Sequence, residues 1–289
     1  MVRRTLKPQR IPPWPSKGIY HHSPITIPSS PIVMRFSTNT IRTILLILTS
    51  ALLNSSLQAN AYWTRVSLRI EGSKRTIFEG TVYTTKHIVT TKSGGTHECD
   101  GTNNGAHNTP GATIIGAIDD AVSLWDGNYD KETRDYSITS IGEDPTTNGG
   151  SWGLLVGYRF VRKGGCQTQV AADDRVLVAF GADKASAFLE ATSDKTSVRL
   201  GEEVGFTVVN GKNGKPVESA TMTAGDTYPK ATTDAYGRAA ISIMNAGVYR
   251  YKAEKDKAIR SNEVSIMVKA AAGAGVERDN TGGHGGLGQ

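Results

Sequence analysis

Short segments in which apolar and polar residues alternate run through most of residues 62–269. In the first of them, Val66, Leu68 and Ile70 are separated by polar residues. A period of two indicates a half-buried strand, because successive side chains of a strand point to opposite faces. The 32 glycines and the aromatic content of 7% also suit many short strands joined by turns. We therefore expect a fold rich in β-structure.

The first predicted domain spans residues 62–182 and contains one helix among several strands. A chain of 289 residues is long enough for two domains. Strand segments lie before and after the helical segment, which predicts an α+β unit with the helix laid across a curved sheet, in a β-grasp-like arrangement. The predicted strands cover residues 62–70, 76–83, 87–91, 136–141, 152–161 and 175–180.

The predicted helix follows from apolar residues at helical spacing. Thr109-Pro110 supplies a capping residue and a first-turn proline, and Gly127 ends the helix. Asp119 and Asp120 could be read as a general acid and base, but neighbours on a helix point about 100° apart, so we expect them on a solvated face. The apolar positions are Ile114, Ile118, Ala121, Val122 and Trp125.

The second predicted domain, residues 190–269, has short strand segments at close spacing. Asn210–Gly214 holds two Asn-Gly dipeptides, which favour tight hairpin turns because both residues tolerate positive φ. About seven strands in this segment predict an antiparallel, Ig-like β-sandwich. The expected fold class is therefore α+β followed by all-β.

An apolar run, ILLILTSALL at residues 44–53, precedes the first domain. Arg35 and Arg42 lie before it and Ala59-Asn60-Ala61 follows it, which predicts a secretory signal peptide over residues 34–61 with cleavage after Ala61. The run covers roughly half of a ~30 Å hydrocarbon core, too little for a membrane anchor. Residues 1–33 are then a disordered upstream extension, and a mitochondrial transit peptide is the alternative for the leader.

The formal net charge of +6 is concentrated in the leader. Residues 1–61 carry seven Lys and Arg residues and no acidic residue, so the remaining 26 of the 33 basic residues face 27 acidic ones. We find no basic run interleaved with aromatic residues after the leader, and we expect no nucleic-acid partner. The Gly- and Ala-rich residues 270–289 are expected to be a disordered tail without a lipid-anchor signal.

The two cysteines, Cys99 and Cys166, both follow the leader. In an oxidising compartment, two cysteines far apart in sequence usually form a disulfide, which here would contribute about 4 kcal/mol in the chain-entropy account. A metal site is the alternative, because His97, Asp100 and His107 lie near Cys99 in sequence. We predict the disulfide, a secreted protein and no metal site.

Four segments of the first domain carry a family pattern: residues 66–80 (VSLRIEGSKRTIFEG), residues 111–113 (GAT), the strand at Trp152, and residues 174–176 (DRV). They resemble the transcobalamin C-terminal-like domain, a family of largely unknown function found on secreted and cell-surface proteins. Val156-Gly157 and Asp173-Asp174 depart from the Asn-Gly and Gly-Asp of the family. The resemblance implies, as one alternative, a module for a corrinoid-like small molecule.

Four segments of the second domain also carry a pattern, at residues 214–220 (GKPVESA), 232–241 (TTDAYGRAAI), 247–253 (GVYRYKA) and 260–268 (RSNEVSIMV). They resemble Ig-like and carboxypeptidase-regulatory-like sandwiches of surface proteins. The resemblance implies a spacer or docking module.

The chain carries no nucleophile elbow, metalloprotease helix, phosphate-binding loop or dinucleotide fingerprint, so we predict a non-enzymatic protein without catalytic residues or cofactor. The leading hypothesis is an extracellular binding or adhesion protein, either free or associated with the cell surface. Its partner is then a glycan, a cell-wall component or a protein. A secreted effector or structural interaction protein is the alternative. Trp152 and Tyr158 are candidate ligand contacts, because an aromatic ring near a turn can stack on a sugar. The sequence leaves the oligomeric state open.

Overall fold

The computed structural model describes residues 63–146 and 150–270. The predictions for the upstream extension (1–33), for the signal peptide (34–61) and for the tail beyond residue 270 lie outside the described residues. Within the described ranges the chain is mostly β-structure, with α2 (Ile114–Ala121) as its α-helix, which confirms the expected β-rich fold. Among these residues, no helix is long and apolar enough to cross a membrane.

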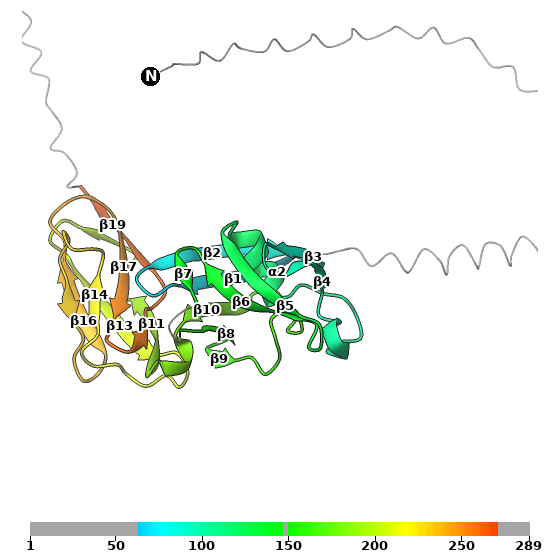
Figure 1. Cartoon of the computed structure of the whole chain (residues 1–289). Helices are drawn as coiled ribbons and strands as arrows, with labels where there is room; N and C mark the ends of the chain where they lie inside the picture. Colours follow the sequence, from blue (N-terminus) through cyan, green and yellow to red (C-terminus); the bar gives the residue numbers. More distant parts are fainter. Residues whose placement is uncertain (1–62, 147–149, 271–289) are drawn as a thin grey trace, which may run out of the picture. The chain divides into compact units, whose positions relative to one another are not determined.

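The N-terminal lobe consists of ten strands and α2 (Figure 1). The strands are β1 (Thr64–Glu71), β2 (Thr76–Thr84), β3 (His87–Thr91), β4 (Gly95–Cys99), β5 (Trp125–Asp130), β6 (Asp135–Ile141), β7 (Asp144–Pro145), β8 (Trp152–Val156), β9 (Arg159–Phe160) and β10 (Arg175–Phe180). The main sheet has the order β2-β1-β10-β8-β9, in which β1 and β10 are parallel and the other pairs antiparallel. Two smaller sheets, β3-β4 and β5-β6-β7, complete the lobe.

β1 shows how alternation fixes the two faces of the main sheet. Val66, Leu68 and Ile70 are fully buried in the core of the N-terminal lobe, as the period of two predicts. Arg69 and Glu71 belong to the opposite set of side chains and are nevertheless buried, with exposures of 6% and 1%. Buried charges need partners, because an unpaired charge away from water costs several kcal/mol. Arg69 pairs with Glu71, and the C-terminal lobe supplies further partners for Glu71.

The helix begins and ends at residues other than those expected. Thr113 caps it in place of Thr109, and the Thr113 hydroxyl accepts a hydrogen bond from the Gly116 amide at 3.1 Å. Trp125 and Gly127, expected at the end of the helix, lie in β5 and pair with β6. The pairing satisfies the backbone groups of this segment, and it overrides the helical spacing of the apolar side chains.

The strand expected over residues 152–161 is divided into β8 and β9. Gly157 and Tyr158 form the turn between them, with φ angles of 55° and 61°, and Val156 pairs with Arg159 across it. Positive φ at both central positions is typical of a type I′ hairpin turn. A tyrosine rarely adopts this conformation, and the burial of its ring, which is 6% exposed, offsets the strain.

The predicted disulfide between Cys99 and Cys166 is confirmed. Both residues are fully buried and belong to the core of the N-terminal lobe. The bridge joins the end of β4 to the loop before β10, across a sequence separation of 67 residues. It therefore closes most of the N-terminal lobe into one covalent loop.

The C-terminal lobe consists of nine strands: β11 (Ala187–Ser193), β12 (Ser197–Arg199), β13 (Glu203–Asn210), β14 (Thr221–Thr223), β15 (Ala231–Thr232), β16 (Arg238–Ser242), β17 (Gly247–Glu254), β18 (Ala258–Ile259) and β19 (Val264–Lys269). Two sheets, β16-β13-β11-β18 and β12-β19-β17-β14-β15, contribute side chains to one common core. The turn expected at Asn210–Gly214 is present, with the Gly214 amide donating to the Asn210 carbonyl at 2.7 Å. β11 was not expected, and it begins before residue 190.

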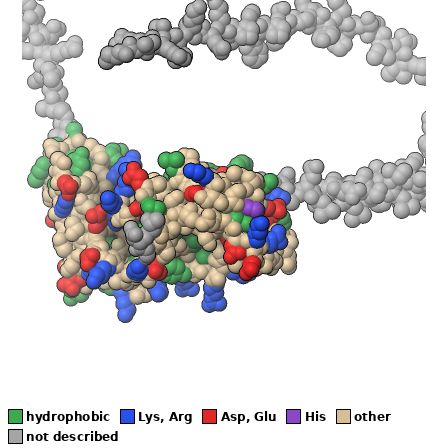
Figure 2. Space-filling model, viewed as in Figure 1, with side chains coloured by type: hydrophobic (Ala, Val, Ile, Leu, Met, Phe, Trp, Pro, Cys, Tyr) green, Lys and Arg blue, Asp and Glu red, His purple; other side chains and the backbone are tan. Residues whose placement is uncertain are grey.

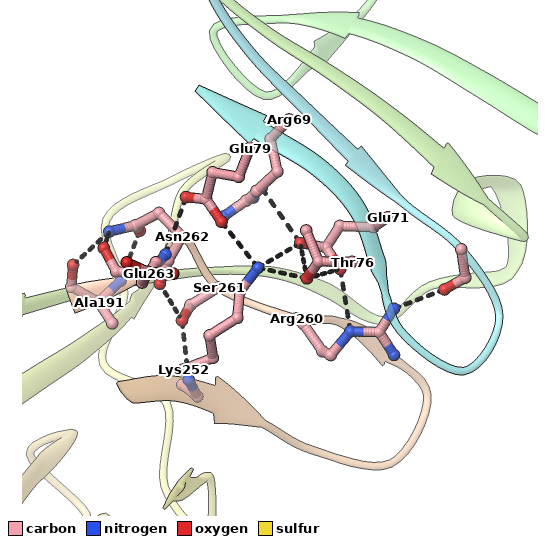
Figure 3. A network of polar contacts seen from close by, with 12 residues as sticks. Arg69, Glu71, Thr76, Glu79, Ala191, Lys252, Arg260, Ser261, Asn262 and Glu263 are labelled. Atoms are coloured by element: carbon pink, nitrogen blue, oxygen red, sulfur yellow. Dashed lines mark hydrogen bonds and ion pairs between the residues drawn. The ribbon is translucent and has the colours of Figure 1, made fainter. Parts of the chain in front are cut away.

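A buried ionic network centred on Glu71 joins the two lobes (Figure 3). Glu71 Oε1 lies 2.7 Å from Lys252 Nζ, and Glu71 Oε2 accepts a hydrogen bond from Arg260 Nε at 2.9 Å. The Lys252 ammonium also lies 2.8 Å from Glu79 Oε2. The side chains of Lys252 and Arg260 are only 16% exposed. Water screens these charges weakly, so they stabilise one another across the junction.

A small apolar cluster accompanies the network. Tyr158 and Leu177 of the N-terminal lobe pack with Phe188 of β11 in this cluster. The junction therefore combines apolar burial with paired charges, and both lobes contribute to each part.

Replacing Glu71 with alanine should lower the free energy of unfolding by about 3–5 kcal/mol, because Lys252 and Arg260 would stay buried without the carboxylate they share. Glu143→Ala is the matched control. Glu143 pairs with Arg75 on the surface, where its side chain is 84% exposed, so its loss should cost less than about 1 kcal/mol. Urea unfolding measures both variants, and equal losses would contradict a stabilising role for the network.

Candidate functional site

A surface hollow of about 440 Å³ lies beside β9, and we call its lining residues the β9 patch. The patch combines basic, aromatic and amide side chains from β8, β9 and two loops. Its residues are His107, Val156, Arg159, Phe160, Val161, Arg162, Lys163, Gln167, Thr168 and Gln169.

The β8-β9 hairpin positions the centre of the patch. Leu155 pairs with Phe160 and Val156 pairs with Arg159, directly after the two-residue turn. The Phe160 ring packs edge-on against Phe188, with 5.8 Å between ring centroids, yet Phe160 remains 46% exposed. One aromatic ring is thus held in place and still open to a ligand.

The disulfide brings together the two loops that complete the patch. Cys166 lies in the loop that carries Lys163 and Gln169, and its partner Cys99 precedes the loop of His107. Hydrogen bonds reinforce the link: Gln169 Nε2 donates to the Thr109 carbonyl at 2.6 Å, and Lys163 Nζ donates to the Ala106 carbonyl at 3.2 Å. The geometry of the patch therefore depends on the oxidised state of the chain.

The buried Asp135 carboxylate fixes the turn at Cys166. It accepts hydrogen bonds from the amides of Cys166 at 3.0 Å, Gln167 at 3.2 Å and Tyr136 at 2.8 Å. Burial raises the pKa of Asp135, whereas the amide donors act in the opposite direction. A carboxylate from β6 thus orders the backbone on which Gln167 and its neighbours reach the patch.

The charged side chains of the patch are all basic. Arg159, Arg162 and Lys163 are all exposed, and within the described part of the chain none of them forms an ion pair. No Asp or Glu is among the lining residues. Figure 2 shows Lys and Arg side chains projecting from the lower edge of the view, where β9 is labelled in Figure 1. The patch therefore offers positive charge that no carboxylate among its lining residues neutralises.

The sequence contains a signal for this patch that our sequence analysis missed. Residues 158–163 (YRFVRK) interleave basic and aromatic residues, contrary to the statement that no such run follows the leader. The run is short, and the strand predicted over residues 152–161 covers most of it, so alternate side chains are expected to point to opposite faces. The hairpin and the loop after it instead gather Arg159, Arg162 and Lys163 around one hollow.

Trp152 and Tyr158, the candidate ligand contacts, lie at opposite ends of β8 and are not brought together. Trp152 is partly buried against Phe180, with 5.4 Å between ring centroids. Tyr158 is buried at the lobe junction, where the Arg175 guanidinium lies 5.0 Å from the centre of its ring. The assignment of both residues as ligand contacts stays a prediction.

The cluster considered for metal binding is divided among other interactions. Cys99 forms the disulfide, His97 stacks on Tyr129 with 3.5 Å between ring centroids, and His107 lies in the β9 patch. The Asp100 carboxylate accepts hydrogen bonds from the amide and hydroxyl of Thr102. In residues 63–146 and 150–270, no group of three or more His, Cys, Asp or Glu residues is arranged to hold a metal ion.

The chain matches no protein-family model and no curated protein. The two family resemblances therefore rest on the sequence segments quoted above, and the function is argued from the site itself.

A second polar cluster joins the helix to β3. His87 Nε2 lies 3.4 Å from Asp119 Oδ2, and His87 Nδ1 lies 3.9 Å from Asp120 Oδ2. Asp119 also accepts a hydrogen bond from Trp125 Nε1 at 2.9 Å, so only Asp120 has the exposed position expected for both aspartates. The Asp119 carboxylate raises the pKa of His87 above 6.5, although partial burial opposes this effect.

A raised pKa in the folded state means that protonated His87 stabilises the fold. This contribution is fully present below the unfolded-state pKa of about 6.5, and it is lost as the pH rises through the higher folded-state pKa. The stabilisation by His87 should therefore decline as the pH rises from about 6.5 through the folded-state pKa. In His87→Asn this decline should be smaller, which the urea midpoint measured at each pH checks. The exposed His107→Asn should leave the decline unchanged, and an unchanged decline in His87→Asn would contradict the prediction.

Proposed function

We propose that this protein is a secreted, non-enzymatic binding protein that adheres to an acidic extracellular polysaccharide through the β9 patch. One observation carries the proposal: Arg159, Arg162 and Lys163, without an ion pair in the described residues, line the same hollow as the partly exposed Phe160. Carboxylate or sulfate groups supply the missing negative charge, and guanidinium groups bind such groups through paired hydrogen bonds. The apolar face of a sugar ring can stack on Phe160.

Export of the chain is part of the proposal. Its support is the disulfide between Cys99 and Cys166, since disulfides persist mainly in oxidising compartments. The predicted signal peptide at residues 34–61 gives a route to such a compartment. Because the disulfide also joins the two loops of the β9 patch, secretion and binding depend on the same bond.

We also propose the finer fold assignments. In the N-terminal lobe, α2 contacts β1, β2 and β3, which supports a β-grasp-like, transcobalamin C-terminal-like domain over residues 62–182. In the C-terminal lobe, the two sheets share one core, which supports an Ig-like β-sandwich over residues 190–269. The C-terminal lobe then serves as a spacer or docking module that presents the β9 patch.

Binding to immobilised polygalacturonate and dextran sulfate, with neutral dextran as the reference, tests the polysaccharide proposal. The full chain should bind the acidic polymers, and binding should weaken as salt rises, because exposed charges are screened. The triple variant Arg159→Gln, Arg162→Gln, Lys163→Gln should bind about tenfold more weakly or worse, since it loses three charge-assisted contacts.

A matched control removes the same charge elsewhere. Lys212, Lys215 and Lys269 are exposed residues of the C-terminal lobe, and their joint replacement by glutamine should leave binding nearly unchanged. Equal losses in both triple variants would mean that net charge, rather than the β9 patch, drives binding. Equally tight binding to single-stranded nucleic acid would also contradict the proposal.

Export has its own test. The chain recovered from the medium of cells that express it should begin at Tyr62, and both cysteines should resist alkylation until a reductant is added. Chain that is retained in the cytosol with residues 34–61 intact and with free thiols would contradict secretion.

A further inference from the structure

Arg69 is a buried cation with an unused hydrogen-bond donor. The residue is 6% exposed, and its Nη1 has no hydrogen-bond partner. Its nearest counter-ion is Glu71, whose Oε1 lies 3.7 Å from Arg69 Nε. Glu71 is shared with Lys252 and Arg260, so it only partly neutralises Arg69 (Figure 3). A buried donor without a partner is costly, which points to a group that this donor could bind.

A small cavity lies beside Arg69. Its volume is about 40 Å³, which is room for a few water molecules or for one carboxylate group. Val176 and Leu177 of β10 are among its lining residues, and Arg175, Tyr158, Glu79 and Asn262 contribute polar groups. Ser67 also lines the cavity and is exposed, so the cavity opens toward solvent at this strand.

Three of the polar lining residues, Arg69, Arg175 and Tyr158, offer hydrogen-bond donors, and the one carboxylate in the lining, that of Glu79, is already paired with Lys252. Tyr158 Oη accepts a hydrogen bond from Arg175 Nη2 at 3.0 Å, which leaves the hydroxyl proton of Tyr158 available. Burial raises the pKa of Tyr158, so the hydroxyl stays protonated near neutral pH. The guanidinium carbons of Arg69 and Arg175 lie 5.9 Å and 5.0 Å from the centre of the Tyr158 ring. One phenol thus lies close to both guanidinium groups.

The charges at the junction do not balance. Arg69, Arg175, Lys252 and Arg260 provide four positive charges, and their ion-pair partners are three carboxylates: Glu71, Glu79 and Glu190. One positive charge is left over at a junction where Arg69, Lys252 and Arg260 are largely buried. A single negative charge in the cavity would remove this excess.

We propose that this cavity, the Arg69 cavity, binds one carboxylate group between Arg69 and Arg175, with Tyr158 as an additional donor. A planar carboxylate matches the fork of a guanidinium group, and its single charge matches the excess at the junction. The site shares no lining residue with the β9 patch and does not depend on the polysaccharide proposal. Tyr158 would then be a ligand contact through its hydroxyl rather than by stacking.

Thermal unfolding of the full chain in sodium formate, sodium acetate or sodium chloride, at constant ionic strength, tests the proposal. Formate and acetate should raise the melting temperature in a saturable manner, because a ligand that binds only the folded state stabilises it. Arg175→Gln should weaken the apparent affinity about tenfold, which corresponds to ~1.4 kcal/mol. Because the Arg175 side chain is 52% exposed, this variant should remain folded.

Two further variants separate the cavity from general charge effects. Arg65→Gln removes a charge from the same face of β1, where Arg65 pairs with Asp173 on the surface, and it should leave the formate response unchanged. Arg69→Lys keeps the charge but removes the guanidinium fork, and it should weaken the response. The proposal is wrong if formate gives no saturable shift, if chloride gives an equal shift, or if Arg175→Gln responds like the unaltered chain.

Discussion

The buried carboxylate of Glu71 couples the two lobes, because it pairs with Lys252 and Arg260 of the C-terminal lobe. Glu71 ends β1, whose Val66, Leu68 and Ile70 form the centre of the N-terminal core. The side chains on one face of β1 therefore pack in the core, and those on the other face lie at the lobe junction. Ion pairs of this kind add little net stability, but each partner becomes indispensable once the others are buried. We interpret the network as a device that favours one docking of the lobes, since Lys252 and Arg260 find their partner in that docking.

At the other end of the N-terminal lobe, the disulfide between Cys99 and Cys166 also joins segments that are far apart in sequence. The disulfide, the Asp135 carboxylate and Gln169 hold together loops that are far apart in sequence. The β9 patch is built on these loops and on a two-residue hairpin turn. Its charged side chains are exposed, whereas these contacts hold the backbone that carries them. Such a surface suits a repeating, charged ligand, because the ligand requires a regular spacing of cations more than a shaped pocket.

Much of the strand content could be predicted from the sequence, because alternation at Val66, Leu68 and Ile70 reflects a local property of the chain. The disulfide followed from the number and separation of the cysteines. The hairpin at Tyr158 could not be predicted, since a tyrosine adopts positive φ only where tertiary packing compensates for it. The candidate sites were missed for a related reason. Alternation alone predicts that the polar face of β1 is exposed to solvent, although Arg69 is buried there. The β9 patch needs a loop that is held near by the disulfide and by hydrogen bonds between residues far apart in sequence.

The parallel pairing of β1 with β10 has a consequence for how the chain reaches this structure. Ser67 pairs with Arg175, so the second edge of β1 is occupied only after more than a hundred later residues have been synthesised. Glu71 lacks its ion-pair partners for longer still, until Lys252 and Arg260 have been synthesised. Contacts of such large sequence separation make folding slow, because the entropy of closing a long loop is lost before the contact is gained. A nascent chain therefore carries an open strand edge until β10 has been synthesised, and an unmatched carboxylate until Lys252 and Arg260 follow.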